Sequence, residues 1–204
     1  MTPFAQMVRR LRYGKAIVVV SGLPRSGTSM AMKMLEAGGM PILVDGIRAA
    51  DISNPKGYYE FEPVKELDKG GDVTWLSAAR GKAVKIISFL LTWLPESYDY
   101  RVIFMQRPLP EVLKSQDEML RRRGTFEANV DSSPIEEAFQ RHLIEVNRWL
   151  NGKSNVQVLR VHYHRTLREP KAAAEAVAEF LKAPLDIEAM TREVDQSLYR
   201  NRMK

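Results

Sequence analysis

The 204-residue sequence contains no cysteine and only three histidines. The lack of cysteine excludes disulfide bonds, thiolate nucleophiles and cysteine-ligated zinc, and it agrees with a reducing compartment. Two of the histidines, His162 and His164, alternate across the end of a predicted strand, and two imidazoles are too few for a metal site. His142 falls on the apolar stripe of a predicted helix, where we expect a core or boundary residue.

Long hydrophobic runs and blocks of one charge are also missing. The apolar run Ala16 to Val20 is far too short to span a membrane, and the residues before it lack the features of a signal peptide. The net charge of +6 comes from 31 basic and 25 acidic residues dispersed along the chain, which indicates a mild preference for anionic ligands. We therefore expect a cytoplasmic protein with no membrane span and no nucleic-acid partner.

Short β-rich runs alternate with helical patterns, and neither repeats nor low-complexity linkers interrupt them. Strand character is found at residues 16–20, 83–87, 101–105 and 156–161. The first of these runs is almost entirely β-branched, as is typical of parallel strands buried on both faces. The pattern predicts the α/β class, with one domain over residues 1–204 arranged in three layers around a central parallel sheet of four or five strands.

Helical patterns follow the strands. One comes after the first strand and ends at Gly38, a second is opened by Pro108, and a third has apolar residues at helical spacing from Ile135 to Leu150. A last helix is expected from about Pro170 to Lys182. Residues 42–82 are irregular, and we expect loops and short helices there that help to shape a pocket.

A glycine-bearing loop joins the first strand to the first helix. Gly22 and Gly27 are five residues apart, as in the phosphate-binding pattern G-x-x-x-x-G-K-[ST], and backbone N–H groups in such a loop converge on an anion. The lysine position of the pattern holds Thr28, although Ser29 fits the last position. Because that lysine reaches the β and γ phosphates of ATP or GTP, its absence argues against triphosphate chemistry at this loop.

Arg25 lies inside the loop and supplies a fixed cation with several donors. A donor whose 5′-phosphate bears a sulfo group carries less charge at its reacting end than a triphosphate. Backbone N–H groups, hydroxyls and one or two cationic side chains can bind such a group, so we expect that no metal is required. The alternative is a tight strand-to-helix turn without a ligand.

A second anion site is indicated by Arg107 and Ser115. Arg107 follows the third predicted strand, at the edge where open α/β sheets bind ligands, and Ser115 comes eight residues later, about two helical turns on. Both side chains can therefore point towards one anion. The alternatives are a surface ion pair for Arg107 and a plain helix-surface serine for Ser115.

These motifs resemble those of the P-loop sulfotransferases. The loop Gly22–Ser29 is similar to their 5′-phosphosulfate-binding loop, close to the P-R-S-G-T form of tyrosylprotein and many bacterial members, and Arg107 with Ser115 resembles their 3′-phosphate site. The segment Asn54–Glu60 resembles a motif of bacterial members, and Tyr163 resembles a residue of the last strand and helix of the family. The resemblance implies that 3′-phosphoadenosine 5′-phosphosulfate (PAPS) is the donor and 3′-phosphoadenosine 5′-phosphate (PAP) the product. The residues it implies for donor binding are Gly22, Pro24, Arg25, Ser26, Gly27, Thr28, Ser29, Arg107, Ser115 and Tyr163.

Lys85 resembles a family lysine that ends a strand. The family usually continues with aspartate and proline, whereas this chain reads Lys85-Ile86-Ile87, so the match is weaker there. A lysine among apolar strand residues is costly to bury without an anionic partner. Lys85 is therefore either a strand-end residue that reaches solvent or, as the resemblance implies, a catalytic residue beside the sulfo group, where charge develops as the bond breaks.

An acceptor hydroxyl needs a proton acceptor. Small-molecule sulfotransferases typically use a histidine, and none of the three histidines fits that role, so a carboxylate is the better candidate, as in tyrosylprotein sulfotransferases. Glu60, which ends the Asn54–Glu60 motif, is our candidate, with Glu62 and Asp45 as rivals and a cap or surface charge as the alternative for each.

The hypothesis is thus a PAPS-dependent sulfotransferase in which Arg25, Glu60 and Lys85 are catalytic. Its acceptor would be a small molecule or carbohydrate with a hydroxyl or amine, and Tyr58, Tyr59, Trp75 and Phe126 are candidates to stack on it. Two alternatives remain: a P-loop kinase of a small metabolite, and a non-catalytic nucleotide-binding protein of the same fold.

Overall fold

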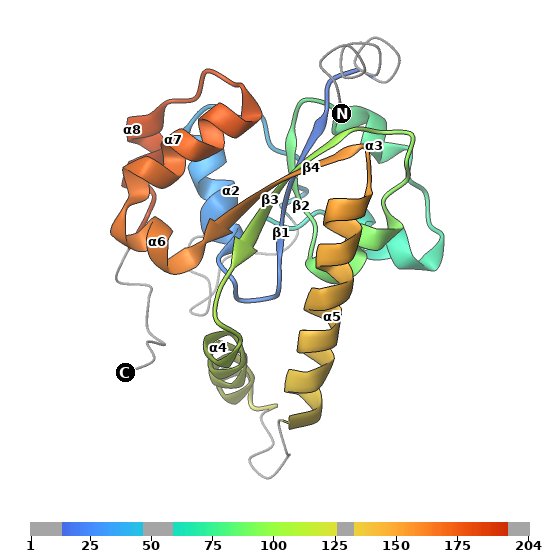
Figure 1. The fold of residues 1–204 in the computed structure, drawn as a ribbon, viewed down its shortest axis with the longest axis vertical. Helices are drawn as coiled ribbons and strands as arrows, with labels where there is room; N and C mark the ends of the chain where they lie inside the picture. The colour runs from blue at the N-terminus through green and yellow to red at the C-terminus, as the bar shows by residue number, and fades with distance from the viewer. Residues whose placement is uncertain (1–13, 47–58, 126–132, 196–204) are drawn as a thin grey trace.

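The computed structural model describes residues 14–46, 59–125 and 133–195. Within them lies a four-stranded, entirely parallel sheet with the strand order β2-β1-β3-β4 (Figure 1). The strands are β1 (Ile17–Gly22), β2 (Ala83–Lys85), β3 (Tyr100–Gln106) and β4 (Val156–His162). The α/β class and the parallel sheet are confirmed. Strand β2 is shorter than predicted, because η2 (Ser88–Trp93), a 3-10 helix, begins three residues after Lys85.

The alternation of side chains along each strand divides the core into two parts. Ile17 and Val19 of β1 face one hydrophobic cluster, whereas Val18 and Val20 face the other. All four are at most 5% exposed, because helices cover both faces of the sheet. An uninterrupted β-branched run therefore indicated a doubly covered strand correctly.

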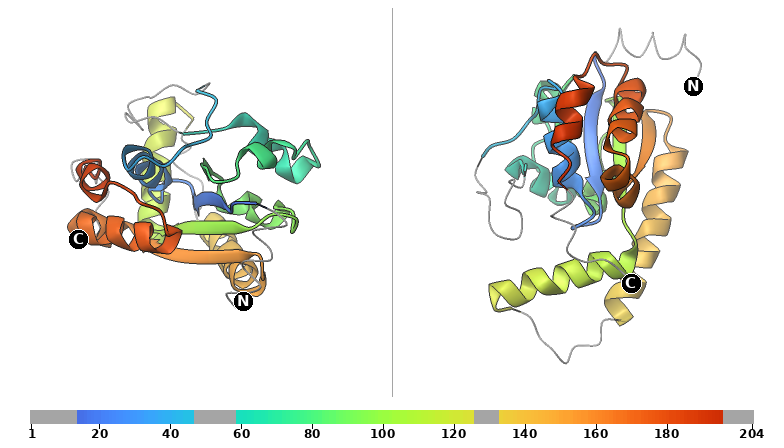
Figure 2. Two further views of the ribbon diagram at one scale, coloured as in Figure 1. Left: turned by 90° about the horizontal axis from the view of Figure 1, so that it is seen from above. Right: turned by 90° about the vertical axis from the view of Figure 1, so that its left-hand side faces the viewer.

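Each face of the sheet has its own set of helices (Figures 1 and 2). One face packs against α2 (Thr28–Ala37), α6 (Tyr163–Arg168), α7 (Pro170–Leu181) and α8 (Ile187–Arg192). The other packs against η1 (Glu62–Lys69), α3 (Trp75–Ala78), η2 and α5 (Ser133–Gly152). The short helices α6 and α8 were not predicted, since six residues give too little helical periodicity to detect.

Helix α4 (Leu109–Arg123) lies across the carboxyl edge of the sheet, next to the loop that follows β1 (Figure 1). Pro108 is the N-cap of this helix, which therefore begins one residue later than predicted. The first half of α5 extends past the same edge, beside α4 (Figure 1). The predicted apolar stripe of α5 is therefore only partly covered: Val146 and Leu150 are buried, but Ile135 is 43% exposed.

Candidate functional site

The loop between β1 and α2 has a backbone that alternates in handedness. The φ angles of Arg25 and Gly27 are +68° and +101°, while Pro24, Ser26 and Thr28 have negative φ. This alternation turns successive N–H groups to one side and forms a concave anion-binding nest. Gly27 is also the N-cap of α2 and has no side chain to cap it, so the first-turn N–H groups of α2 open towards the same concavity.

Both glycines of the loop are required by close contacts as well as by backbone conformation. A Cβ atom on Gly22, which has a φ of +149°, would lie 2.5 Å from Ser26 Oγ and 2.7 Å from the carbonyl oxygen of Met105. A Cβ atom on Gly27 would lie 2.6 Å from Cδ2 of Tyr163. The loop is therefore packed tightly between the end of β3 and the ring of Tyr163.

Ser26 supplies a buried polar atom to this loop. The residue is 1% exposed, and its Oγ has no hydrogen-bond partner among the described residues. Leaving a buried hydroxyl without a partner costs about 1–3 kcal/mol, so such an atom in a native structure calls for an explanation. A phosphate or sulfo oxygen is a partner of suitable chemistry, and the loop therefore fits the anion that its sequence predicts.

Arg25 and Ser115 are brought together although they are ninety residues apart. The Nε atom of Arg25 donates to Ser115 Oγ at 3.1 Å. Ser115 is 5% exposed and lies on the face of α4 that packs against the sheet edge. The predicted loop and the predicted second anion site are thus one continuous polar region.

Arg107 links this region to the rest of the fold. Its Nη1 donates to the carbonyl oxygen of Arg25 at 3.1 Å, and its Nε donates to Glu111 Oε2 at 3.0 Å. The guanidinium carbon lies 4.7 Å from the ring centroid of Tyr163, within cation–π range. The side chain of Arg107 is 6% exposed, so an arginine expected to bind a phosphate also has a structural role.

Glu111 is a residue of this site that sequence reasoning missed. It is 2% exposed, and its Oε2 contacts both Arg107 and Nε2 of His164, the latter at 2.8 Å. A buried carboxylate is costly unless it is paired, and here two nitrogen donors from α6 and the end of β3 pair with it. The i,i+4 spacing of Arg107 and Glu111 was the signal that could have revealed it.

Tyr163 lies under the loop. Burial is the main cause that raises the pKa of its phenol, and the charges of Arg107 and Arg25 oppose this rise. The ring of Tyr163 packs against both Gly27 and Arg107, and it thereby holds the loop against the end of β3.

Lys85 and Arg107 come from the strands on either side of β1. Lys85 ends β2 and pairs in register with Val20, two residues before the loop, whereas Arg107 directly follows β3. Parallel strands end at the same edge of the sheet, so the structure brings both residues to the carboxyl edge where the loop lies.

Glu60 reaches this edge from the other side of β2. Ile42 forms a parallel bridge with Ala83, and three residues later the N–H of Asp45 donates to the carbonyl of Glu60 at 3.4 Å. The side chain of Glu60 is 17% exposed, and its Oε2 lies 3.6 Å from Nζ of Lys65.

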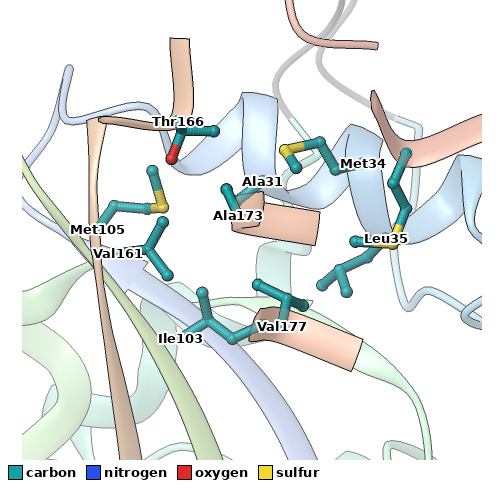
Figure 3. A pocket seen from close by; sticks show the side chains of 10 residues that line it. Ala31, Met34, Leu35, Ile103, Met105, Val161, Thr166, Ala173 and Val177 are labelled. Carbon is teal, nitrogen blue, oxygen red and sulfur yellow. The ribbon is translucent and has the colours of Figure 1, made fainter. Parts of the chain in front are cut away.

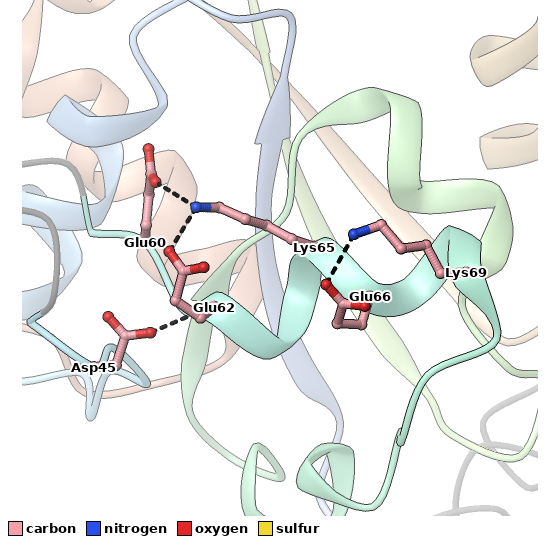
Figure 4. A network of polar contacts seen from close by, with 6 residues as sticks. All are labelled: Asp45, Glu60, Glu62, Lys65, Glu66 and Lys69. Atoms are coloured by element: carbon pink, nitrogen blue, oxygen red, sulfur yellow. Dashed lines mark hydrogen bonds and ion pairs between the residues drawn. The ribbon is translucent and has the colours of Figure 1, made fainter.

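The two rival carboxylates have other contacts (Figure 4). Asp45 accepts a hydrogen bond from the N–H of Glu62, the first residue of η1, and so acts as a cap of that helix. Glu62 is 41% exposed on its side chain and pairs with Lys65. Glu60 is the least exposed partner of Lys65 in this network.

Part of the predicted acceptor region lies outside the described residues, namely Asn54–Tyr58 and Phe126. Tyr59 is described: its OH donates to Glu36 Oε2 at 2.6 Å, and burial followed by this hydrogen bond raises its pKa. Trp75 packs edge-on against Phe61, with 5.4 Å between the ring centroids.

No described helix is long and apolar enough to cross a membrane. Among the same residues, no three carboxylates or imidazoles gather as a metal site would require.

A pocket lies on the face of the sheet that packs against α2, between α2, β3, β4, α6, α7 and α8 (Figure 3). Its lining is apolar apart from Thr166, whose hydroxyl donates to the carbonyl of His162 at 3.0 Å. The pocket is thus a gap in the hydrophobic core, and it offers no donor for an anion.

Models of protein families and curated protein sequences give no match to this chain. Solved structures, in contrast, do match this chain. A sulfotransferase of Mycobacterium tuberculosis aligns over 95% of this chain and 74% of its own, with a TM-score of 0.58 and 15% identity. A mouse sulfotransferase in complex with PAP aligns over 93% of this chain and 68% of its own, with a TM-score of 0.58 and 14% identity. A sulfotransferase of Mycobacterium avium aligns over 93% and 69%, with a TM-score of 0.55 and 14% identity. The chain therefore has the fold of sulfotransferases, in agreement with the resemblance of its motifs.

Proposed function

We propose that this protein is a sulfotransferase that moves a sulfo group from PAPS to a hydroxyl or amine of a small-molecule or carbohydrate acceptor. One observation carries the proposal: Arg25, inside the phosphate loop, is hydrogen-bonded to both residues of the predicted 3′-phosphate site. Its Nε contacts Ser115 and its carbonyl oxygen contacts Arg107, each at 3.1 Å. A molecule with a 5′-phosphosulfate and a 3′-phosphate needs two such anion sites side by side.

The donor would be held by groups of two kinds. The nest of N–H groups, the buried hydroxyl of Ser26 and the start of α2 suit the 5′-phosphosulfate. Arg107 and Ser115 suit the 3′-phosphate. The pairing of Arg107 with Glu111 fixes the plane of its guanidinium, so little side-chain entropy would be lost on binding.

In the transfer step, the acceptor oxygen forms a bond to sulfur as the bond from sulfur to the bridging phosphate oxygen breaks. The acceptor proton goes to Glu60, and the electron pair of the broken bond stays on the phosphate of PAP. Arg25 and Lys85 would stabilise the charge that develops on the bridging and sulfo oxygens. Positioning and electrostatics supply most of the acceleration in the related chemistry of phosphoryl transfer.

Ligand-dependent stability tests the donor assignment. PAP at about a hundred times its Kd should raise the free energy of unfolding by about 2.7 kcal/mol, while Mg-ATP at the same concentration should add much less, because Thr28 occupies the lysine position of the loop. Stabilisation by Mg-ATP and not by PAP would favour a kinase. Binding of PAP without transfer of ³⁵S from labelled PAPS to any of a panel of alcohols, sugars, phenols and amines would favour a non-catalytic protein.

Two substitutions test the residues. Arg107→Ala should weaken PAP binding at least about tenfold, the effect of one lost charge-assisted contact, whereas Arg122→Ala, which removes an exposed arginine of α4, should leave it unchanged. Glu60→Gln should reduce kcat by about 10²-fold or more at an unchanged Kd for PAP. Wild-type turnover by Glu60→Gln would transfer the role of base to another group.

A further inference from the structure

Two basic side chains meet at one oxygen of Glu111. Its Oε2 accepts a hydrogen bond from Nε of Arg107 at 3.0 Å and lies 2.8 Å from Nε2 of His164. An ionised carboxylate can only accept hydrogen bonds, so Nε2 of His164 carries a hydrogen, and Nδ1 is the atom that gains a proton when the imidazole becomes charged. The side chain of Glu111 is 2% exposed and that of His164 is 33% exposed, so the imidazole can exchange protons with solvent while the carboxylate stays buried.

The pairing with Glu111 reduces the positive charge that Arg107 can offer to a ligand. The two side chains are almost fully buried, and together they carry no net charge. Nη1 of Arg107 also donates to the carbonyl oxygen of Arg25. A phosphate that binds Arg107 therefore comes under the field of Glu111 as well. A dianion close to a buried carboxylate is unfavourable unless another cation joins them.

His164 is in the right place to become that cation. Its Nε2 contacts the same oxygen as Nε of Arg107, so the two nitrogens lie at most about 6 Å apart, within the range over which one charge shifts the protonation of another. The charged or titratable groups around the imidazole include Glu111 of α4, Arg107 after β3, Tyr163 of α6 and, acting on Tyr163, Arg25 of the loop and Asp195 after α8. Among these types of side chain, imidazole is the one that ordinarily changes charge between about pH 5 and 8.

We propose that His164 takes up a proton when the 3′-phosphate of the donor binds to Arg107, so that affinity for the donor rises as the pH falls through the imidazole range. This inference rests on the proposed function, in which Arg107 binds that phosphate. His164 acts through Glu111: the charged imidazole neutralises the carboxylate and leaves the charge of Arg107 to the phosphate. The proton comes from solvent on binding and returns to solvent when the nucleotide leaves. His164 is thus a positioning residue and not a catalytic one.

Calorimetric titration of the full chain with PAP, in two buffers of different ionisation enthalpy, measures the number of protons taken up. Adenosine 5′-monophosphate (AMP), which has a 5′-phosphate but no 3′-phosphate, is the matched ligand. We expect the wild type to take up more protons with PAP than with AMP. The Kd for PAP should fall about three- to tenfold between about pH 8 and about pH 6.5, because full uptake of one proton changes affinity about tenfold per pH unit.

Two variants assign the proton to a residue. His164→Gln keeps a side-chain N–H near the place of Nε2 but cannot be charged, so it should bind PAP with neither the extra uptake nor the dependence on pH. Phosphate groups themselves titrate near about pH 6, and comparing this variant with the wild type at each pH corrects for them. His162→Gln removes an exposed imidazole two residues earlier and should behave like the wild type.

Equal proton uptake with PAP and AMP in the wild type would overturn this inference, and that comparison needs no variant. Undiminished uptake in His164→Gln would assign the proton to another group and overturn it too. PAP binding separates the two proposals. If PAP binds without any dependence on His164, the donor assignment stands and this inference fails, whereas no PAP binding at any pH would overturn both.

Discussion

Arg107 fixes the backbone of Arg25: the guanidinium Nη1 of the first donates to the carbonyl oxygen of the second at 3.1 Å. A residue that follows β3 thereby sets the shape of the loop that follows β1. Since Arg25 has a left-handed φ of +68°, a conformation that costs a non-glycine residue about 1–2 kcal/mol, the contact stabilises a strained position. Two segments far apart in the sequence form one site through this pair.

Replacing Arg107 should lower stability as well as donor affinity. In Arg107→Ala, Glu111 keeps its charge at 2% exposure and loses the arginine that pairs with it, while the half-buried His164 still contacts the carboxylate. Breaking such a buried pair costs about 3 kcal/mol or more, and His164 should reduce this to about 2–3 kcal/mol. Urea denaturation of the wild type and Arg107→Ala measures this loss of unfolding free energy. The double variant Arg107→Ala/Glu111→Gln should recover part of the loss, and no recovery would contradict the view that the unpaired charge is its cause.

Gly27 should tolerate no side chain. Gly27→Ala combines a φ of +101° with a Cβ atom 2.6 Å from Tyr163, so the loop or the ring must move. Gly39→Ala is the matched control, because Gly39 has a φ of +86° but no atom within 4 Å of its would-be Cβ. The control should lose about 1 kcal/mol of unfolding free energy from backbone strain alone, and Gly27→Ala should lose clearly more and also lose its response to PAP. Equal losses would show that Tyr163 can move aside freely.

Arg25 should separate stability from function. Arg25→Gly removes the guanidinium and relieves the left-handed backbone, whereas Arg25→Ala removes the guanidinium and keeps the strain. We expect Arg25→Gly to be more stable than Arg25→Ala by about 1 kcal/mol in urea denaturation, and both to lose sulfo transfer. If Arg25→Ala were the more stable variant, the strain at this position would be refuted.

The parts of the site that could be predicted from sequence are those that depend on local pattern. The buried β-branched run, the glycine spacing and the helical stripe of α2 required no knowledge of distant contacts, and the structure has β1, the loop and α2 where they were expected. The end of the third predicted strand also located Arg107 at the carboxyl edge, whereas only the resemblance placed Lys85 there, because the predicted second strand continued to Ile87.

What sequence could not supply is pairing between distant segments. Glu111 was overlooked because a glutamate in the first turn of a helix is ordinary, and its burial depends on His164 from another helix. The periodicity of Ile135 to Leu150 predicted the helix α5, but it could not show that the first half of the helix extends past the sheet edge, where Ile135 is 43% exposed. His142 was expected in the core or at its boundary, and its contact with Ser88 could not be foreseen.

The half-buried ring of His142 should make stability depend on pH. Its pKa in the folded protein lies below the ordinary value of 6.5, so the unfolded chain binds a proton more readily than the folded one. Stability from the neutral ring is therefore fully present above about pH 6.5 and is lost as the pH falls through the lower folded value. Since solvent reaches the ring, we expect a loss of less than about 1 kcal/mol between about pH 7.5 and pH 5. Urea denaturation of the wild type and of His142→Gln at both pH values isolates this contribution. The wild type should lose more stability than the variant on acidification, and parallel losses in the two proteins would show that His142 is not the titrating group.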